Sequence, residues 1–199
     1  ARKMRVAGRI AGRALREAGK VIAPGLSTWE LDKVVESYIR SQGAHPSFKG
    51  YGGFPAAACI SVNDVVIHGI PSKKQILRAG DIVSVDVGAY IDGFHGDTAF
   101  TFPVGEVSDA AGRLMDATRE SLYEVIGFLK EGVRIGDIGH AVESYVAARG
   151  YSVVRDFVGH GVGRALHEDP GIPNYGRAGH GVRLMKGSTV AIEPMVNEG

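Results

Sequence analysis

The sequence has very little cysteine and no long apolar run. Cys59 is the only cysteine in 199 residues, which excludes an internal disulfide and a zinc site built from several cysteines. No stretch approaches the ~20 apolar residues that a membrane span needs, and the basic first 21 residues lack the apolar run of a signal peptide. We therefore expect a cytoplasmic protein with no membrane partner, in which any metal is held by His, Asp and Glu.

Neither sign of charge dominates. The 23 Lys and Arg residues balance 22 Asp and Glu residues, and the net charge of +1 gives no overall electrostatic footprint for nucleic acid. The 29 glycines are scattered among patterned segments, which indicates tight turns and not a flexible linker. With 44% hydrophobic residues, the chain can bury the core of one domain spanning residues 1–199.

Hydrophobic periodicity predicts an order of helices and strands that occurs twice. Ser27, with Glu30 three positions on, is a typical helix start, and Asp92-Gly93 is a typical hairpin turn. The first half, about 1–105, is expected to hold helices over 1–22 and from 28 to Gly43, and strands over 56–62, 81–89 and 94–102. The second half, about 106–199, is expected to hold helices over 108–130 and 137–149, and strands near 152–158 and 188–193.

Short sequence matches between these halves keep one constant offset. A shift of 107 residues places 35–38 (VESY) on the identical 142–145, and it places the strand 80–86 on 187–193 without a gap. The same shift aligns Asp86 with Glu193. Two duplicated halves that pack about a pseudo-twofold axis would bring these two acids to equivalent places, where ligand sites are commonly built.

Asp86 interrupts an apolar strand, where an unpaired carboxylate is costly to bury. A turn at 91–92 would set Asp97 of the next strand directly opposite Asp86, whereas a turn at 92–93 would make the two diagonal neighbours. Both registers keep the carboxylates on one face, where they repel each other unless a cation lies between them or one is protonated. A divalent metal satisfies this, and solvation of one acid or its pairing with an arginine is the alternative.

Three histidines stand in segments suited to a site. His160 lies within 159–163 (GHGVG), His167 follows in 166–168 (LHE), and His68 comes just after an apolar strand. Each alone is more typical of a structural histidine, but with three carboxylates they fit a mixed oxygen and nitrogen site for two metals about 3.5–4 Å apart. The sequence lacks a phosphate-binding loop, a second histidine of the H-E-x-x-H type and a nucleophile elbow, so metal-dependent hydrolysis is the favoured chemistry.

Five segments, in order and spacing, resemble the signature blocks of the type I methionine aminopeptidases, a family of pita-bread metallopeptidases. They are 61–71 (SVNDVVIHGIP), 86–88 (DVG), 92–98 (DGFHGDT), 159–163 (GHGVG) and 192–195 (IEPM). The resemblance covers essentially the whole chain. It implies an α+β pita-bread (creatinase/aminopeptidase) fold, with two pseudo-symmetric halves around a curved antiparallel sheet and helices outside.

The resemblance also implies roles for individual residues. Glu193 would be both a ligand and the general base, and His68 and His167 would be catalytic and face the substrate. The implied methionine pocket is lined by Tyr51, Phe54 and Cys59, although their residue types suit an ordinary core equally well. The implied ligands of two divalent ions (Co, Mn, Fe or Zn) are Asp86, Asp97, His160 and Glu193, with Asp97 bridging both ions. In the family a fifth ligand, a glutamate, follows the 192–195 block by roughly thirty residues, and we expect this sequence to end before it.

The implied activity is removal of the N-terminal methionine from nascent proteins and peptides, preferably when the second residue is small. The expected partner is a nascent polypeptide or peptide N-terminus; the ribosome is a further partner compatible with this role, nucleic acid specificity is not expected, and the expected state is a monomer. Two alternatives stay open. One is a prolidase-like peptidase, whose chains usually carry a further N-terminal domain, and the other is a pita-bread binding module that has lost its metals.

Overall fold

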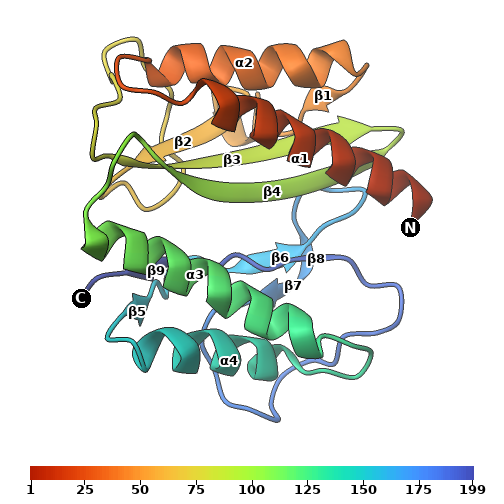
Figure 1. The fold of residues 1–199 in the computed structure, drawn as a ribbon. Helices are drawn as coiled ribbons and strands as arrows, with labels where there is room; N and C mark the ends of the chain where they lie inside the picture. Colours follow the sequence, from red (N-terminus) through yellow and green to blue (C-terminus); the bar gives the residue numbers. More distant parts are fainter. The chain divides into compact units, whose positions relative to one another are not determined.

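The computed structural model describes residues 1–199, which divide into two compact units (Figure 1). Unit 1 comprises Ala1–Ser108 and Gly163–Leu166, and unit 2 comprises Asp109–Val162 and His167–Gly199. Each unit contains both helices and antiparallel strands, which confirms the predicted α+β class. None of the helices is long and apolar enough to cross a membrane.

Unit 1 packs two helices against an antiparallel sheet (Figure 1). Its helices are α1 (Arg2–Val21) and α2 (Thr28–Ser41), its strands are β1 (His45–Pro46), β2 (Ala58–Val62), β3 (Ile82–Ile91) and β4 (Phe94–Pro103), and a short 3-10 turn, η1, spans Tyr51–Gly53. The long strand β3 pairs with the other three strands. Alternate β3 residues Val83, Val85, Val87 and Ala89 are fully buried in a core that α1 and α2 complete.

Local chemistry explains where the helices of unit 1 begin and how closely they pack. The Ser27 hydroxyl accepts the Glu30 backbone N–H, and the Glu30 carboxylate accepts the Ser27 N–H, which is the predicted capping box. In α1 the buried side is mostly alanine, with Ile10 and Leu15 as its larger residues. These small side chains let the α1 backbone come close to β4, where Gly96 lies against Ala7 and Gly8.

Unit 2 has two packed helices and only short strands (Figure 1). Its helices are α3 (Asp109–Phe128) and α4 (Ile135–Ala147), and its strands are β5 (Ser152–Val153), β6 (Gly159–Gly161), β7 (Glu168–Ile172), β8 (Val190–Ala191) and β9 (Val196–Asn197). β6 pairs with both β7 and β8, and β5 pairs with β9. The strands predicted near 152–158 and 188–193 are therefore shorter than expected, and α4 begins two residues before the predicted 137.

One hydrogen-bond pattern recurs in both units at the shift of 107 residues. Gly25 donates its N–H to the carbonyl of Leu77, and Gly132 donates to the carbonyl of Leu184. The isolated bridge between Ser27 and Ile76 has its counterpart between Arg134 and Arg183. These matched contacts are what an internal duplication entails, so they support the predicted repeat from inside each unit.

Candidate functional site

In unit 1 the hairpin of β3 and β4 places Asp86 and Asp97 on one face of the sheet. The turn is Asp92-Gly93, because Ile91 pairs with Phe94. In this register Asp97 lies opposite Gly88, two positions from Asp86 along β3, so the two acids are diagonal neighbours. The structure thus selects the second of the two predicted registers and keeps both carboxylates on the same side.

Cys59 joins this face from the neighbouring strand. In the β2–β3 ladder Cys59 lies directly opposite Asp86. Burial, together with the nearby negative charges of Asp86 and Asp97, raises the pKa of the Cys59 thiol well above its ordinary value. The side chain therefore stays a neutral, polarisable thiol and is unsuited to act as a nucleophile.

Phe54 and Cys59, both assigned to the substrate pocket, belong to one small apolar cluster. Cys59 packs with Phe48 and Leu166, and the half-buried Phe54 packs against this group. Leu166 belongs to the segment Gly163–Leu166, which also receives the backbone N–H of His95 at the Gly163 carbonyl (2.8 Å). The third predicted pocket residue, Tyr51, lies on η1 and is half exposed.

Two acids of α2 hold the chain segment that carries these pocket residues. The buried Asp32 carboxylate accepts the backbone N–H groups of Ala57 and Ala58, at 2.8 and 3.0 Å, just before Cys59. One turn further along α2, Glu36 binds Lys49 at 2.7 Å, just before Tyr51. Both ends of residues 49–58 are thus bound to α2. No sequence motif predicts this constraint.

Glu36 makes unit 1 sensitive to acid. Burial by itself would raise its pKa, but hydrogen bonds from Lys33, Lys49 and Arg40 outweigh burial and lower the pKa from 4.5 to about 2. Because the folded-state pKa is depressed, this stabilisation is fully present above about pH 4.5 and is lost as the pH falls through about 2. The lowered pKa of Glu36 corresponds to a contribution on the order of 3 kcal/mol to the free energy of unfolding.

We therefore expect Glu36→Gln to lower the free energy of unfolding at pH 7 by a few kcal/mol, while parent and variant become alike near pH 2. Urea titrations at both pH values would measure this difference. Glu106→Gln removes an exposed carboxylate without a salt bridge and is the matched control, expected to stay within about 0.5 kcal/mol of the parent. An equal loss at pH 2 and pH 7 would contradict an ionic origin.

His68 lies in a loop that is pinned to β2. The Gly69 N–H donates to the Ser61 hydroxyl at 3.0 Å, and the Gly69 carbonyl accepts the Ile60 N–H at 2.8 Å. A Cβ at Gly69 would come within 2.1 Å of the Ile60 carbonyl oxygen, so only glycine fits there. His68 itself is exposed and has a φ of 57°, a left-handed conformation that costs energy and is common at functional sites.

In unit 2 the structure brings His160, His167 and Glu193 together. The ring centroids of His160 and His167 lie 4.2 Å apart in an edge-to-face arrangement. His160 Nε2 lies 3.1 Å from Glu193 Oε1, and the two side chains are 12% and 35% exposed. Three predicted site residues, from β6, from the residue before β7 and from just beyond β8, are thus neighbours.

The contact between His160 and Glu193 places a ring nitrogen against a buried carboxylate oxygen. His160 Nδ1 lies 2.8 Å from the Gly161 carbonyl, which can only accept, so Nδ1 carries the proton of the neutral ring and Nε2 presents a lone pair. Glu193 Oε1 is buried and has no hydrogen-bond partner. Either the second proton of an imidazolium or a metal ion would satisfy this pair, and a histidine whose other nitrogen donates to a backbone carbonyl is typical of metal ligands.

The glycines beside His160 serve the packing of strands. A Cβ at Gly159 would lie 2.3 Å from the Ala191 carbonyl oxygen, and one at Gly161 would lie 2.4 Å from the Asp169 carbonyl oxygen. These glycines therefore allow β8 and β7 to approach β6 closely. Sequence reasoning also missed Asn174, which is fully buried and donates its amide to the Glu193 carbonyl at 2.6 Å.

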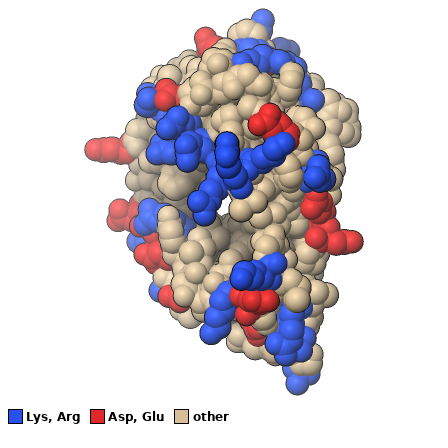
Figure 2. All heavy atoms as spheres, turned by 90° about the vertical axis from the view of Figure 1, so that its right-hand side faces the viewer, with Lys and Arg blue, Asp and Glu red and all other residues tan.

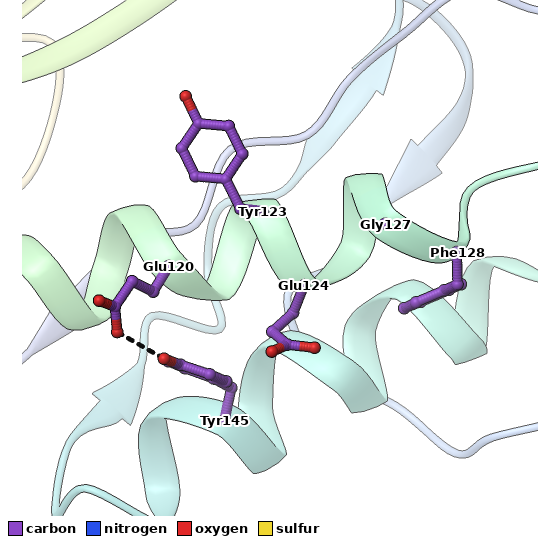
Figure 3. Close-up of a pocket in the computed structure, with 6 residues that line it drawn as sticks. All are labelled: Glu120, Tyr123, Glu124, Gly127, Phe128 and Tyr145. Carbon is purple, nitrogen blue, oxygen red and sulfur yellow. Dashed lines mark hydrogen bonds between the residues drawn. The ribbon is translucent and has the colours of Figure 1, made fainter.

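The two groups of site residues belong to different units, and the structure contains no group of three or more His, Cys, Asp or Glu side chains arranged to hold a metal ion. A separate hollow of about 620 Å³ lies on α3 and α4, where Tyr145 donates a hydrogen bond to Glu120 (Figure 3). Its lining contains none of the predicted site residues, so it is not the predicted site.

Comparison with known proteins shows the family to which the chain belongs. The model of metallopeptidase family M24 matches residues 2–199. The chain belongs to this family. It is 50% identical to the methionine aminopeptidase of Clostridium acetobutylicum over 98% of this chain and 78% of the relative. The crystal structure of methionine aminopeptidase from Thermotoga maritima matches with a TM-score of 0.98 and 50% identity, over 100% of this chain and 80% of that one, which confirms the pita-bread fold.

A solved Xaa-Pro dipeptidase from Bacillus anthracis shares the fold at lower similarity. Its TM-score is 0.82 and its identity 28%, and the chain covers 97% of itself but only 52% of that longer protein. The methionine aminopeptidase structure thus has the higher TM-score and sequence identity, and this chain covers more of its length. Membership of a metallopeptidase family also establishes that the expected chemistry depends on divalent metal ions.

Proposed function

We propose that this chain is a methionine aminopeptidase that removes the N-terminal methionine from nascent proteins and peptides, preferably where the second residue is small. The observation that carries the proposal is the contact of His160 Nε2 with the buried Glu193 Oε1, a nitrogen and an oxygen that one metal ion would hold together. The half-identical relatives that bear this activity in their names support it. We expect the enzyme to be a cytoplasmic monomer that acts on its substrates beside the ribosome.

The proposed metal ligands are Asp86, Asp97, His160 and Glu193, two from each unit. Carboxylate oxygens and an imidazole nitrogen suit divalent Co, Mn, Fe or Zn, and these residues would hold two such ions. The chemistry that such ions supply is Lewis acidity toward the peptide carbonyl and a nucleophile available at neutral pH.

The protein groups would then divide the proton and charge transfers among themselves. Glu193 would take a proton from the attacking water and return it to the leaving amine, as a general base and then a general acid. His167, which is exposed and in ring contact with His160, would donate a hydrogen bond to the developing oxyanion. His68 would contact the scissile amide. The hydrogen bond from the Gly69 N–H to the Ser61 hydroxyl of β2 would hold His68 in position.

The methionine side chain would be received by Tyr51, Phe54 and Cys59. A flexible thioether packs well against aromatic rings and a neutral thiol. Cys59 keeps its proton beside Asp86 and Asp97, so it can serve as a polarisable wall without adding a third negative charge. Cys59 lies opposite Asp86 in the β2–β3 ladder, so the proposed pocket adjoins the proposed metal ligands at this pair of residues.

Asp32 would act as a positioning residue for this pocket. We expect Asp32→Asn to raise KM for methionyl peptides several-fold more than it lowers kcat, because the amide cannot accept the N–H groups of both Ala57 and Ala58 as strongly as the carboxylate does. Steady-state kinetics would measure the split. Asp64→Asn, at an exposed position just after β2, is the control. A parallel fall in activity and folded fraction, with KM unchanged, would mean that Asp32 acts on stability alone.

The direct test of the function is methionine release from a Met-Gly peptide by metal-stripped protein titrated with Co²⁺ or Mn²⁺, using protein expressed from its complete reading frame. We expect cleavage only with metal, faster for Met-Gly than for Met-Leu, and none of an Xaa-Pro dipeptide. Cleavage of the Xaa-Pro dipeptide alone would favour the prolidase-like alternative. Absence of both cleavage and metal binding would favour the metal-free binding module.

A further inference from the structure

The exposed side of α1 carries a continuous line of positive charge, here called the arginine stripe. Its members are all exposed and follow one another at three or four positions, so they lie on one side of the helix: Arg2, Arg5, Arg9, Arg13, Arg16 and Lys20. At 1.5 Å per residue the stripe is about 27 Å long. Figure 2, which views the molecule from the side on which α1 begins, shows Lys and Arg gathered over that end of unit 1.

Nothing within the protein compensates most of this charge. Glu17 is the only acidic residue of α1, and its carboxylate binds Lys20 at 2.7 Å. The five arginines form no salt bridge. Like charges at this spacing destabilise a helix by ~0.2–0.5 kcal/mol per pair, and basic residues in the first turn also oppose the helix dipole. The stripe therefore costs stability without an internal benefit.

The chemistry of the stripe fits a long polyanion. Arginine presents a planar fork of N–H donors that matches phosphate oxygens in pairs, and five of the six residues are arginine. At the end of the stripe Arg13, Arg16, Glu17, Lys20 and Tyr38 line a hollow of about 360 Å³. Tyr38 thus adds an aromatic ring beside the cations, as in surfaces that track a nucleic acid backbone.

A membrane surface fits less well, because α1 has no apolar face to insert. An interfacial helix buries its apolar side in the lipid. The apolar side of α1 is already buried in the core of unit 1, through Ala7, Ile10, Ala11, Ala14, Leu15 and Ala18.

The net charge of +1 for the whole chain does not reveal the stripe. Seven of the 23 basic residues but only one of the 22 acids lie in residues 1–20.

We propose that the arginine stripe binds the phosphate backbone of RNA without sequence preference. Contacts to phosphate fix position and carry no sequence information, so we expect no preference among sequences from them. The choice of RNA rests on the proposed function, because the N-termini of newly made polypeptides emerge beside RNA. The stripe would hold the enzyme where its substrates appear.

The test is binding of a fluorescently labelled RNA duplex of about 20 base pairs, measured by anisotropy as the salt concentration rises from about 50 to 300 mM. Arg9→Gln with Arg13→Gln removes two charges from the middle of the stripe, and Arg177→Gln with Lys186→Gln removes two exposed charges from unit 2. We expect the stripe variant to bind about tenfold or more weakly at 0.1 M salt, with the slope of log K against log salt reduced by about 2. The control should stay within about twofold.

Several outcomes would overturn the proposal. They are equal weakening by both variants, tighter binding to a DNA duplex of the same sequence, and stronger binding to phosphatidylserine vesicles or to poly-glutamate than to RNA. The stripe variant should be at least as stable as the parent in urea, so that lost binding cannot reflect unfolding. It should also cleave a free Met-Gly peptide normally. RNA binding without any peptide cleavage would support the stripe while counting against the proposed aminopeptidase.

Discussion

Glu193→Gln should lower kcat/KM for methionine release by about 10²–10⁴-fold, the range expected for loss of a general base. The amide of Gln has almost the shape of the carboxylate but can neither take a proton nor carry charge to a metal. Its NH₂ group could donate to Nε2 of a neutral His160, the atom that lies 3.1 Å from Oε1 in the native protein. We therefore expect the metal-free variant to be as stable as the parent, or more so, while its affinity for metal falls.

Three measurements on Glu193→Gln separate these effects: peptide cleavage, bound metal per chain by elemental analysis, and the urea midpoint without metal. Glu198→Gln, which changes an exposed carboxylate five residues later, is the matched control and should leave all three unchanged. If Glu193→Gln kept more than half of the parental activity, Glu193 could not be the base. If it lost activity only because it unfolded, the result would not support a role of the His160–Glu193 contact in metal binding.

Gly96→Ala should destabilise unit 1 by about 3 kcal/mol or more. A Cβ at this position would lie 2.3 Å from the backbone nitrogen of Gly8 and 2.4 Å from the carbonyl carbon of Ala7. Both atoms belong to the α1 backbone, so no side chain can rotate to make room and the helix must move off β4. Urea unfolding followed by circular dichroism would measure the loss.

Gly8→Ala is the matched control from the other side of the same contact. A Cβ on Gly8 would meet no atom within 4 Å, and the residue lies inside α1. Alanine is favoured over glycine in a helix by roughly 0.5–1 kcal/mol, so this variant should be more stable than the parent. The opposite sign of the two substitutions distinguishes close backbone packing from a general intolerance of change. Equal effects would show that α1 does not approach β4 this closely.

The predicted elements succeeded where short-range interactions decide the structure. The start of α2 depends on Ser27 and Glu30, three residues apart, and both hydrogen bonds of the box form as predicted. The β3–β4 hairpin depends on a two-residue turn, although both 91–92 and 92–93 satisfied the sequence and only the pairing of Ile91 with Phe94 separates them. The short strands of unit 2 were extended too far, because apolar β-branched residues there pack in the core without a long ladder.

The sequence by itself determined the α+β class, the order of helices and strands, and the acids and histidines that could form a site, because periodicity, caps and residue chemistry are written within a few positions. Only the tertiary structure decided that Asp97 is diagonal to Asp86, that His160 Nε2 faces a buried oxygen of Glu193, and that Asp32 holds the strand of Cys59. These features join residues far apart in the chain, and their geometry depends on how closely backbones approach, which no local pattern encodes.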